Sequence, residues 1–220
     1  MRHREFLCLL LELSLVTVCV VGLISAVYGR GGQKAWFLGP FVLTFGALLP
    51  TFLKGRNLAD IGFRVDRIGL SLRLLGQACL VISPLVICCV LVLRHSGIEP
   101  PLRVLVPRDH WLSWLGFQFA CVALPEEVFF RGYLLGNMLL LLKMAAGKDC
   151  TAIEILGIVL TACIFAVSHV LVLGNVSSMI TFFPGLIFGW LFVKTKSLIA
   201  PVLFHGLANA GYGLVTTRLV

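Results

Sequence analysis

Apolar residues run along the chain in long stretches that short polar or basic segments separate. A helix needs about 20 apolar residues to cross the hydrocarbon core of a bilayer. The pattern predicts seven membrane segments, at Phe6–Tyr28, Ala35–Leu53, Leu72–Leu93, Trp111–Leu142, Thr151–Leu173, Val176–Val193 and Leu198–Val215. No stretch shows the alternation over ~10 residues that is typical of outer-membrane barrel strands. We therefore expect an all-α, polytopic transmembrane helical bundle, forming a single integral membrane domain over residues 1–220.

The fourth segment is longer than one upright crossing requires. At about 1.5 Å per residue, its roughly 32 residues would extend about 48 Å. Pro125 lies in its middle, and proline inside a helix removes a hydrogen bond and kinks or ends the helix. Two interpretations stay open. Either Trp111–Leu124 is an interfacial or re-entrant helix and a new helix starts at Pro125, or the whole segment is one long, kinked span.

Composition supports a membrane protein. Hydrophobic residues make up 59% of the chain and charged residues 13%, with a mean hydropathy of +1.02. Soluble domains are about 45–50% apolar and about 25% charged. The eight cysteines include no C-x-x-C pair and lie mostly in apolar runs, which favours small buried hydrophobes over a disulfide framework or a cysteine metal site.

The net charge of +8 arises from basic residues between the apolar runs, as expected for loops near anionic lipid headgroups. Because no basic stripe with interleaved aromatic residues occurs, nucleic acid is excluded as a partner. The loop between the second and third segments is rich in lysine and arginine, from Lys54 to Arg73. The bias of these residues between the two sides predicts a cytoplasmic N-terminus.

Three charges interrupt the apolar run ALPEEVFFRGYLL, residues 123–135. A charged side chain at the bilayer centre costs roughly 2.5–3.5 kcal/mol on insertion scales. Glu127 and Arg131 are four residues apart on one helix face and can pair. Glu126 lies about 100° around the helix and has no such local partner. One carboxylate is thus explained by pairing within its helix and the other is not.

Two further apolar segments carry polar side chains. His169 lies within IFAVSHVL, and His205 and Asn209 lie four residues apart within PVLFHGLANAG. Buried polar groups must find partners, so we expect these side chains to gather with Glu126 in one cavity. There Glu126 is a candidate general base for a water molecule, and the imidazoles and the amide could position that water or stabilise an oxyanion. Hydrolysis of a peptide bond fits this set.

The same residues resemble a known family. EEVFFR matches E-E-x-x-x-R, FAVSH matches F-x-x-x-H, and HGLAN matches H-x-x-x-N, in this order on successive membrane segments. Together they are similar to the CPBP family of intramembrane proteases. That family includes type II CAAX prenyl endopeptidases, bacteriocin-processing and immunity proteins, and myxosortases. The resemblance covers about residues 112–215, which would form the protease core.

The resemblance implies a role for each site residue. Glu126 would activate the hydrolytic water, His169 would position it, and His205 with Asn209 would stabilise the oxyanion. Glu127 would hold Arg131 and shape the site. Apart from the resemblance, we expect Phe165 to be a packing residue at the wall of the cavity. Two histidines and a glutamate, His169, His205 and Glu126, could also bind zinc with an open position. We favour a metal-free site, because no H-E-x-x-H motif occurs and asparagine is a poor zinc ligand.

Two other functions stay open: a catalytically idle scaffold or immunity protein of the same fold, and a proton-coupled transporter. For a protease, the substrate would be a membrane-anchored protein or peptide, bearing a C-terminal sorting signal, a peptide precursor or a CaaX-type terminus. The short chain, without an appended domain or targeting segment, favours a bacterial inner-membrane enzyme. The sequence makes no prediction of the oligomeric state. Five glycines, Gly132, Gly185, Gly189, Gly206 and Gly211, are expected at close helix contacts.

Overall fold

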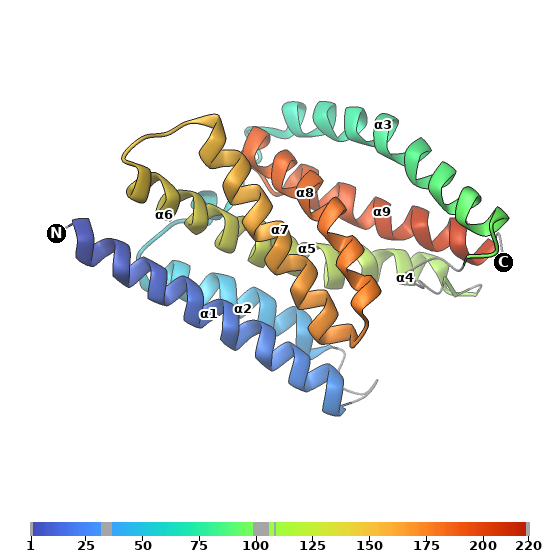
Figure 1. Ribbon diagram of the computed structural model, residues 1–220, viewed down its shortest axis with the longest axis horizontal. Coiled ribbons are helices and arrows are strands. Elements are labelled where there is room, and N and C mark those ends of the chain that lie inside the picture. The colour runs from blue at the N-terminus through green and yellow to red at the C-terminus, as the bar shows by residue number, and fades with distance from the viewer. Residues whose placement is uncertain (1, 32–36, 99–105, 108, 219–220) are drawn as a thin grey trace.

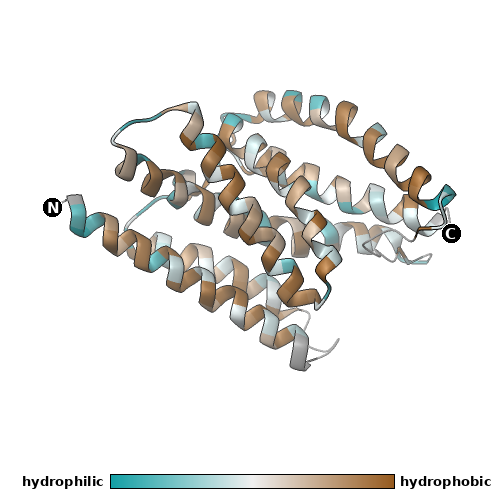
Figure 2. Ribbon diagram, viewed as in Figure 1, coloured by the Kyte–Doolittle hydropathy of each residue, from teal (hydrophilic) through white to brown (hydrophobic). Residues whose placement is uncertain are grey.

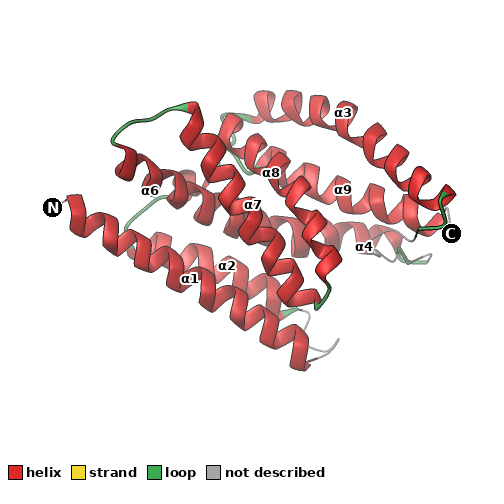
Figure 3. Cartoon of the chain, in the orientation of Figure 1, coloured by secondary structure: helices red, strands yellow, loops and turns green. Residues whose placement is uncertain are grey.

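Helices account for all the regular structure in the computed structural model, which describes residues 2–31, 37–98, 106–107 and 109–218. Figure 3 shows helices and loops but no strand in this part of the chain. The expected all-α polytopic bundle is confirmed. The helices are α1 (Arg2–Gly31), α2 (Leu38–Leu53), α3 (Ile68–His95), α7 (Thr151–Leu173), α8 (Phe182–Thr195) and α9 (Ile199–Arg218), together with one long helix from Trp111 to Ala146.

Within the described residues, five helical segments are long and apolar enough to cross a membrane. They are His3–Tyr28, Ile68–His95, Trp111–Ala146, Thr151–Leu173 and Val176–Thr195. Two of the seven predicted spans fall short of these criteria: α2 has 16 residues, and α9 carries His205, Asn209 and several glycines and threonines. The predicted start of the second span at Ala35 lies outside the described residues. The protein is an integral membrane protein.

The long helix Trp111–Ala146 runs through the middle of the bundle (Figure 1). Helices α1 and α2 pack together on one side of it, and α3 lies at the opposite edge against α9. Helix α7 crosses between these groups and packs on α8 and α1. The start of α1 and the end of α9 lie at opposite ends of the molecule. Figure 2 shows mostly apolar residues along α1 and α3, and large apolar side chains such as Leu11 and Leu80 are exposed, as expected for helices that face lipid.

The fourth segment is one continuous helix rather than a re-entrant piece followed by a new helix at Pro125. It consists of α4 (Trp111–Phe117), the π-helical η3 (Gln118–Ala123), α5 (Leu124–Glu127), the π-helical η4 (Val128–Leu135) and α6 (Gly136–Ala146). Pro125 lies just after η3. A π turn widens the helix, so the proline ring and its missing N–H are accommodated without a break.

The loop between α2 and α3 packs against the bundle at the turn between α8 and α9. Leu198 N donates to the carbonyl of Gly62 (2.9 Å), and Ser197 Oγ donates to the carbonyl of Arg64 (2.8 Å). Ile61 is buried. A Cβ atom on Gly132 would lie only 2.6 Å from the carbonyl oxygen of Ile61. The absence of a side chain at Gly132 therefore lets this loop reach the long helix.

Four of the five glycines expected at helix contacts have close neighbours. A Cβ atom at Gly132, Gly185, Gly189 or Gly206 would lie within 3.2 Å of an atom on another element, whereas Gly211 has nothing within 4 Å. The expectation for Gly211 is therefore wrong. Spacing along a helix does not reveal which side of that helix a neighbour covers, and this part of α9 has no neighbour close to Gly211.

A polar cluster ties α1 and α2 to the long helix. Glu12, in the middle of α1, forms an ion pair with Lys54 and accepts a hydrogen bond from the Tyr133 hydroxyl (3.2 Å). Next to it, Arg56 donates to Asn137 Oδ1 (2.5 Å), and Asn137 Nδ2 donates to the carbonyl of Tyr133 (2.8 Å). Glu12 was not expected to matter from the sequence, although it is a carboxylate inside an apolar span and needs partners just as Glu126 does.

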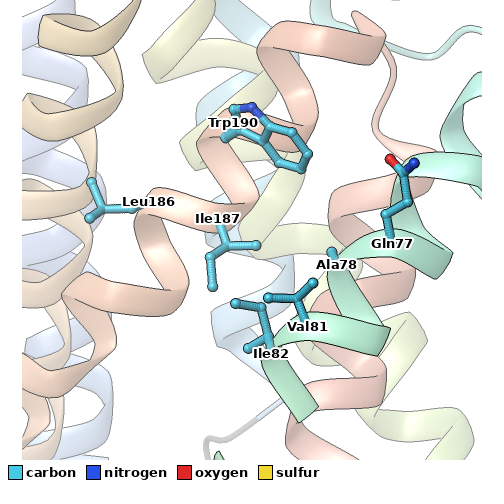
Figure 4. Close-up of a pocket in the computed structure, with 7 residues that line it drawn as sticks. All are labelled: Gln77, Ala78, Val81, Ile82, Leu186, Ile187 and Trp190. Atoms are coloured by element: carbon cyan, nitrogen blue, oxygen red, sulfur yellow. The ribbon is translucent and has the colours of Figure 1, made fainter. Parts of the chain in front are cut away.

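An apolar cavity of about 410 Å³ lies between α3 and α8. Figure 4 shows Ile187 on α8 next to Val81 and Ile82 on α3, and Leu186 and Trp190 of α8 also line the cavity. None of the ionisable candidate residues lines this cavity.

The contact at Gly132 provides a test of the fold. We expect Gly132→Ala to destabilise the protein by about 1–3 kcal/mol, because the new methyl group would overlap the Ile61 backbone. Gly136→Ala, on the same helix with nothing within 4 Å of the added atom, is the matched control. We expect it to be neutral or stabilising, since alanine favours helix more than glycine does. Thermal unfolding in detergent measures both, and equal midpoints would contradict the packing of this loop.

Candidate active site

Two adjacent glutamates on α5 point to different partners. Glu127 is completely buried and contacts Arg131 and His205. Glu126 is 18% exposed at its side chain and faces the rings of His169 and His205. Successive helical residues are about 100° apart, and this separation directs one carboxylate into the core and the other toward the histidines.

One oxygen atom of Glu127 joins two helices. Oε1 accepts a hydrogen bond from Arg131 Nη1 (3.0 Å) and another from His205 Nδ1 (2.8 Å). The Glu127–Arg131 pair expected from the sequence therefore forms. The contact with His205 on α9 was not expected, because it depends on how α9 packs against the long helix. Through it, Glu127 fixes the plane of the His205 ring.

The Arg131 guanidinium lies among aromatic rings. Its central carbon is 4.4 Å from the Phe165 ring centroid and 4.9 Å from that of Phe188. Arg131 Nη2 also donates to the carbonyl of Gly185 on α8 (3.3 Å). Cation–π contacts with desolvated rings are worth about 2 kcal/mol or more, so the aromatic rings help to offset the burial of the charge.

Phe165 does more than wall the cavity. Its ring packs on Phe130, with centroids 4.9 Å apart, and on His169 at 4.4 Å, in addition to the Arg131 guanidinium. On the other side of the site, Phe188 of α8 stacks on the His205 ring at 4.7 Å and an angle of 15°. Phe188 was not predicted from the sequence, because a phenylalanine in an apolar helix gives no signal of its own.

The Glu126 carboxylate lies between the two histidines. Nε2 of His169 and Nε2 of His205 are each 3.9 Å from Glu126 Oε2. That oxygen is buried and has no hydrogen-bond partner among the described residues. The structure thus brings together Glu126 from α5, His169 from α7 and His205 from α9, as the burial argument expected.

The hydrogen bonds at Nδ1 fix what each imidazole presents to Glu126. His169 Nδ1 lies 2.9 Å from the carbonyl oxygen of Phe165, and His205 Nδ1 lies 2.8 Å from the Glu127 carboxylate. Carbonyl and carboxylate oxygens only accept, so each Nδ1 carries hydrogen. In a neutral ring the Nε2 lone pair then faces Glu126. A water molecule can donate hydrogen to acceptors arranged in this way.

Asn209 lies one turn beyond His205 on α9, and its amide contacts a residue that sequence analysis missed. Asn209 Nδ2 donates to Gln118 Oε1 at 3.0 Å. Gln118 is in η3, eight residues before Glu126 in the chain. Its signal in the sequence was a polar amide inside an apolar segment, the same signal that drew attention to His169.

The donor set at the site also suits a metal by its chemistry. Two imidazole Nε2 atoms with Nδ1 anchored elsewhere, together with a carboxylate, are the kind of ligands that zinc takes. In the described part of the chain, however, no group of three His, Cys, Asp or Glu side chains has the spacing of a metal site. Glu126, His169 and His205 would have to move closer together to hold an ion.

The fold and the site together define a polytopic membrane protein with a glutamate–histidine centre enclosed by its helices. Residues 108–211 match the family model described as "Type II CAAX prenyl endopeptidase Rce1-like". This match agrees with the resemblance drawn from the three motifs, and it covers just under half of the chain, in the segment that carries them. No curated protein and no solved structure matches the chain.

Removing Arg131 tests the energetics of the buried pair. We expect Arg131→Met to destabilise the protein by about 3–5 kcal/mol, because Glu127 would keep a buried, incompletely compensated charge. The double variant Arg131→Met with Glu127→Gln should recover much of that loss. Thermal and denaturant unfolding in detergent measure both. Additive losses in the double variant would contradict the coupling of the two side chains.

Proposed function

We propose that this protein is an intramembrane endopeptidase that hydrolyses a peptide bond of a membrane-anchored protein or peptide. The observation that carries the proposal is the approach of His169 and His205 to a single oxygen of Glu126, at 3.9 Å each. The match to a prenyl endopeptidase family supports it. On the lysine and arginine bias, we also propose that the N-terminus lies on the cytoplasmic side of the membrane.

In the first step, Glu126 accepts a proton from a water molecule that His169 positions through its Nε2 lone pair. The water oxygen bonds to the carbonyl carbon of the substrate, and the electron pair of the C=O bond moves to the carbonyl oxygen. In the second step, Glu126 returns the proton to the amide nitrogen and the C–N bond breaks. General acid–base catalysis of this kind contributes typically 10²–10⁴-fold.

His205 and Asn209 are the proposed donors to the oxyanion. They lie four residues apart on one face of α9, about 6 Å along the axis, and in the proposed mechanism both donate to one oxygen atom. To donate from Nε2 while Nδ1 donates to Glu127, the His205 ring has to carry hydrogen on both nitrogens. In that form its Nε2 is a donor, whereas the Nε2 of a neutral His169 remains an acceptor for the water molecule.

The proposed reaction is metal-free, because Asn209 suits an oxyanion donor better than a zinc ligand. If zinc were present, Glu126, His169 and His205 would hold it, and it would lower the pKa of its bound water.

Replacing Glu126 tests the mechanism. We expect Glu126→Gln, which is nearly isosteric but cannot act as a base, to lower cleavage by at least about 100-fold while expression and the thermal midpoint stay the same. The protein is reconstituted in liposomes with three substrates: a prenylated CaaX peptide, a membrane-anchored peptide precursor and a protein with a C-terminal sorting helix. Mass spectrometry detects the products.

Glu154→Gln is the matched control for Glu126→Gln, since Glu154, near the start of α7, pairs with Lys194 and Lys196 at the end of α8. It should cleave as the wild type does. Wild-type rates in the Glu126→Gln protein would rule out the mechanism. Failure of the wild-type protein to cut any of the three substrates would favour an idle scaffold or immunity protein.

Metal dependence is tested separately. We expect treatment with 1,10-phenanthroline and EDTA to leave cleavage unchanged, and elemental analysis of the purified protein to find zinc well below one ion per chain. Loss of activity that added zinc restores would overturn the metal-free mechanism.

A further inference from the structure

Asn209 can act as an oxyanion donor only if its amide nitrogen, and not its oxygen, faces the substrate. The terminal torsion of asparagine is broad and roughly two-fold, so the side chain can present either atom. If Oδ1 faced the developing negative charge, it would repel it. Some contact must therefore select the orientation of this amide.

The contact that the structure shows is with Gln118. Asn209 Nδ2 donates to Gln118 Oε1 at 3.0 Å, and both side chains are half-buried. A primary amide nitrogen has two hydrogens. One is taken by Gln118, and the other is left to donate elsewhere. A flipped Asn209 would set two oxygens against each other unless Gln118 also turned.

Packing around this pair keeps the two helices close. The ring of Phe119 lies over Gly206, where a Cβ atom would be only 2.4 Å from it. Gly206 and Phe119 are the immediate chain neighbours of His205 and Gln118. Their contact lets η3 approach α9 closely enough for the two amides to meet.

The π-helical geometry of η3 bears on the same alignment. A π turn holds more residues than an α turn. Through η3, the side chains at the start of the long helix are therefore rotated about its axis relative to those on α5, compared with a regular α-helix. As a result the long helix meets α9 twice, through Glu126 and Glu127 at His205 and through Gln118 at Asn209.

We propose that Gln118 is a positioning residue that orients the Asn209 amide as an oxyanion donor. This inference rests on the proposed protease function. Gln118 does not itself touch the substrate, and it acts by fixing which atom of Asn209 faces the scissile carbonyl.

The test is a set of kinetic measurements on Gln118→Met, which has a similar shape but cannot accept this hydrogen bond. We expect kcat to fall about tenfold, less than the 10²–10³-fold typical of removing an oxyanion donor, with KM little changed. Gln77→Met is the matched control, since Gln77 lies on α3 at the apolar cavity away from the site, and it should retain wild-type kcat.

A double-mutant cycle separates positioning from general destabilisation. In the Asn209→Ala background, Gln118→Met should cause no further loss of kcat, because the group that it orients is gone. A full additional tenfold loss in that background would overturn the proposal. So would an unchanged kcat in the single variant, or a change confined to KM.

A measurement that does not depend on activity keeps the proposal distinct from the proposed function. In protein labelled with ¹⁵N at asparagine, with Asn209→Ala used for assignment, Gln118→Met should shift the Asn209 side-chain amide protons upfield and speed their exchange with water. Gln77→Met should change neither. If the wild-type protein cuts no substrate, the protease proposal fails while this measurement still decides whether Gln118 holds Asn209. Unaltered amide signals in Gln118→Met would overturn the inference.

Discussion

The structure of the site depends on the buried carboxylate of Glu127. An ionised carboxylate without partners in an apolar interior is costly, and Glu127 accepts hydrogen bonds from Arg131 and His205. The first bond lies within the long helix and the second ties that helix to α9. Arg131 in turn bonds to α8 at Gly185 and packs on Phe165 of α7. One carboxylate thus organises four helices around the position of Glu126.

The aromatic rings of α7 and α8 make such a burial of charge possible. Phe165 and Phe188 face the Arg131 guanidinium, and the same rings pack on His169 and His205 respectively. They fill the space that would otherwise admit water to the ion pair, and they hold the imidazole planes. The polar site and its apolar wall are therefore one packed unit, and a change in either is expected to disturb both.

The two π-helical stretches accommodate a proline inside the long helix. Pro125 precedes the glutamates by one residue, and an α-helix resists a proline in its interior. Widened turns on both sides of α5 keep the helix continuous through this point. The helix can then carry Gln118, Glu126, Glu127 and Arg131 on one rigid element, where a loop would position them less well.

Hydropathy alone predicted the all-helical membrane architecture. Because charged side chains are costly in lipid, a long run of apolar residues directly indicates a membrane-spanning helix. The same cost singled out Glu126, Glu127, Arg131, His169, His205 and Asn209 as side chains that need partners. Which partners they find was decided by the tertiary structure. The bonds from His205 to Glu127 and from Asn209 to Gln118 join residues 78 and 91 positions apart, and no local pattern specifies such pairs. The roles of Gln118, Glu12 and Phe188 depend on the side chains that they contact on other helices. The sequence of a helix shows which of its own faces are polar or apolar, but not which residues of other helices pack against them.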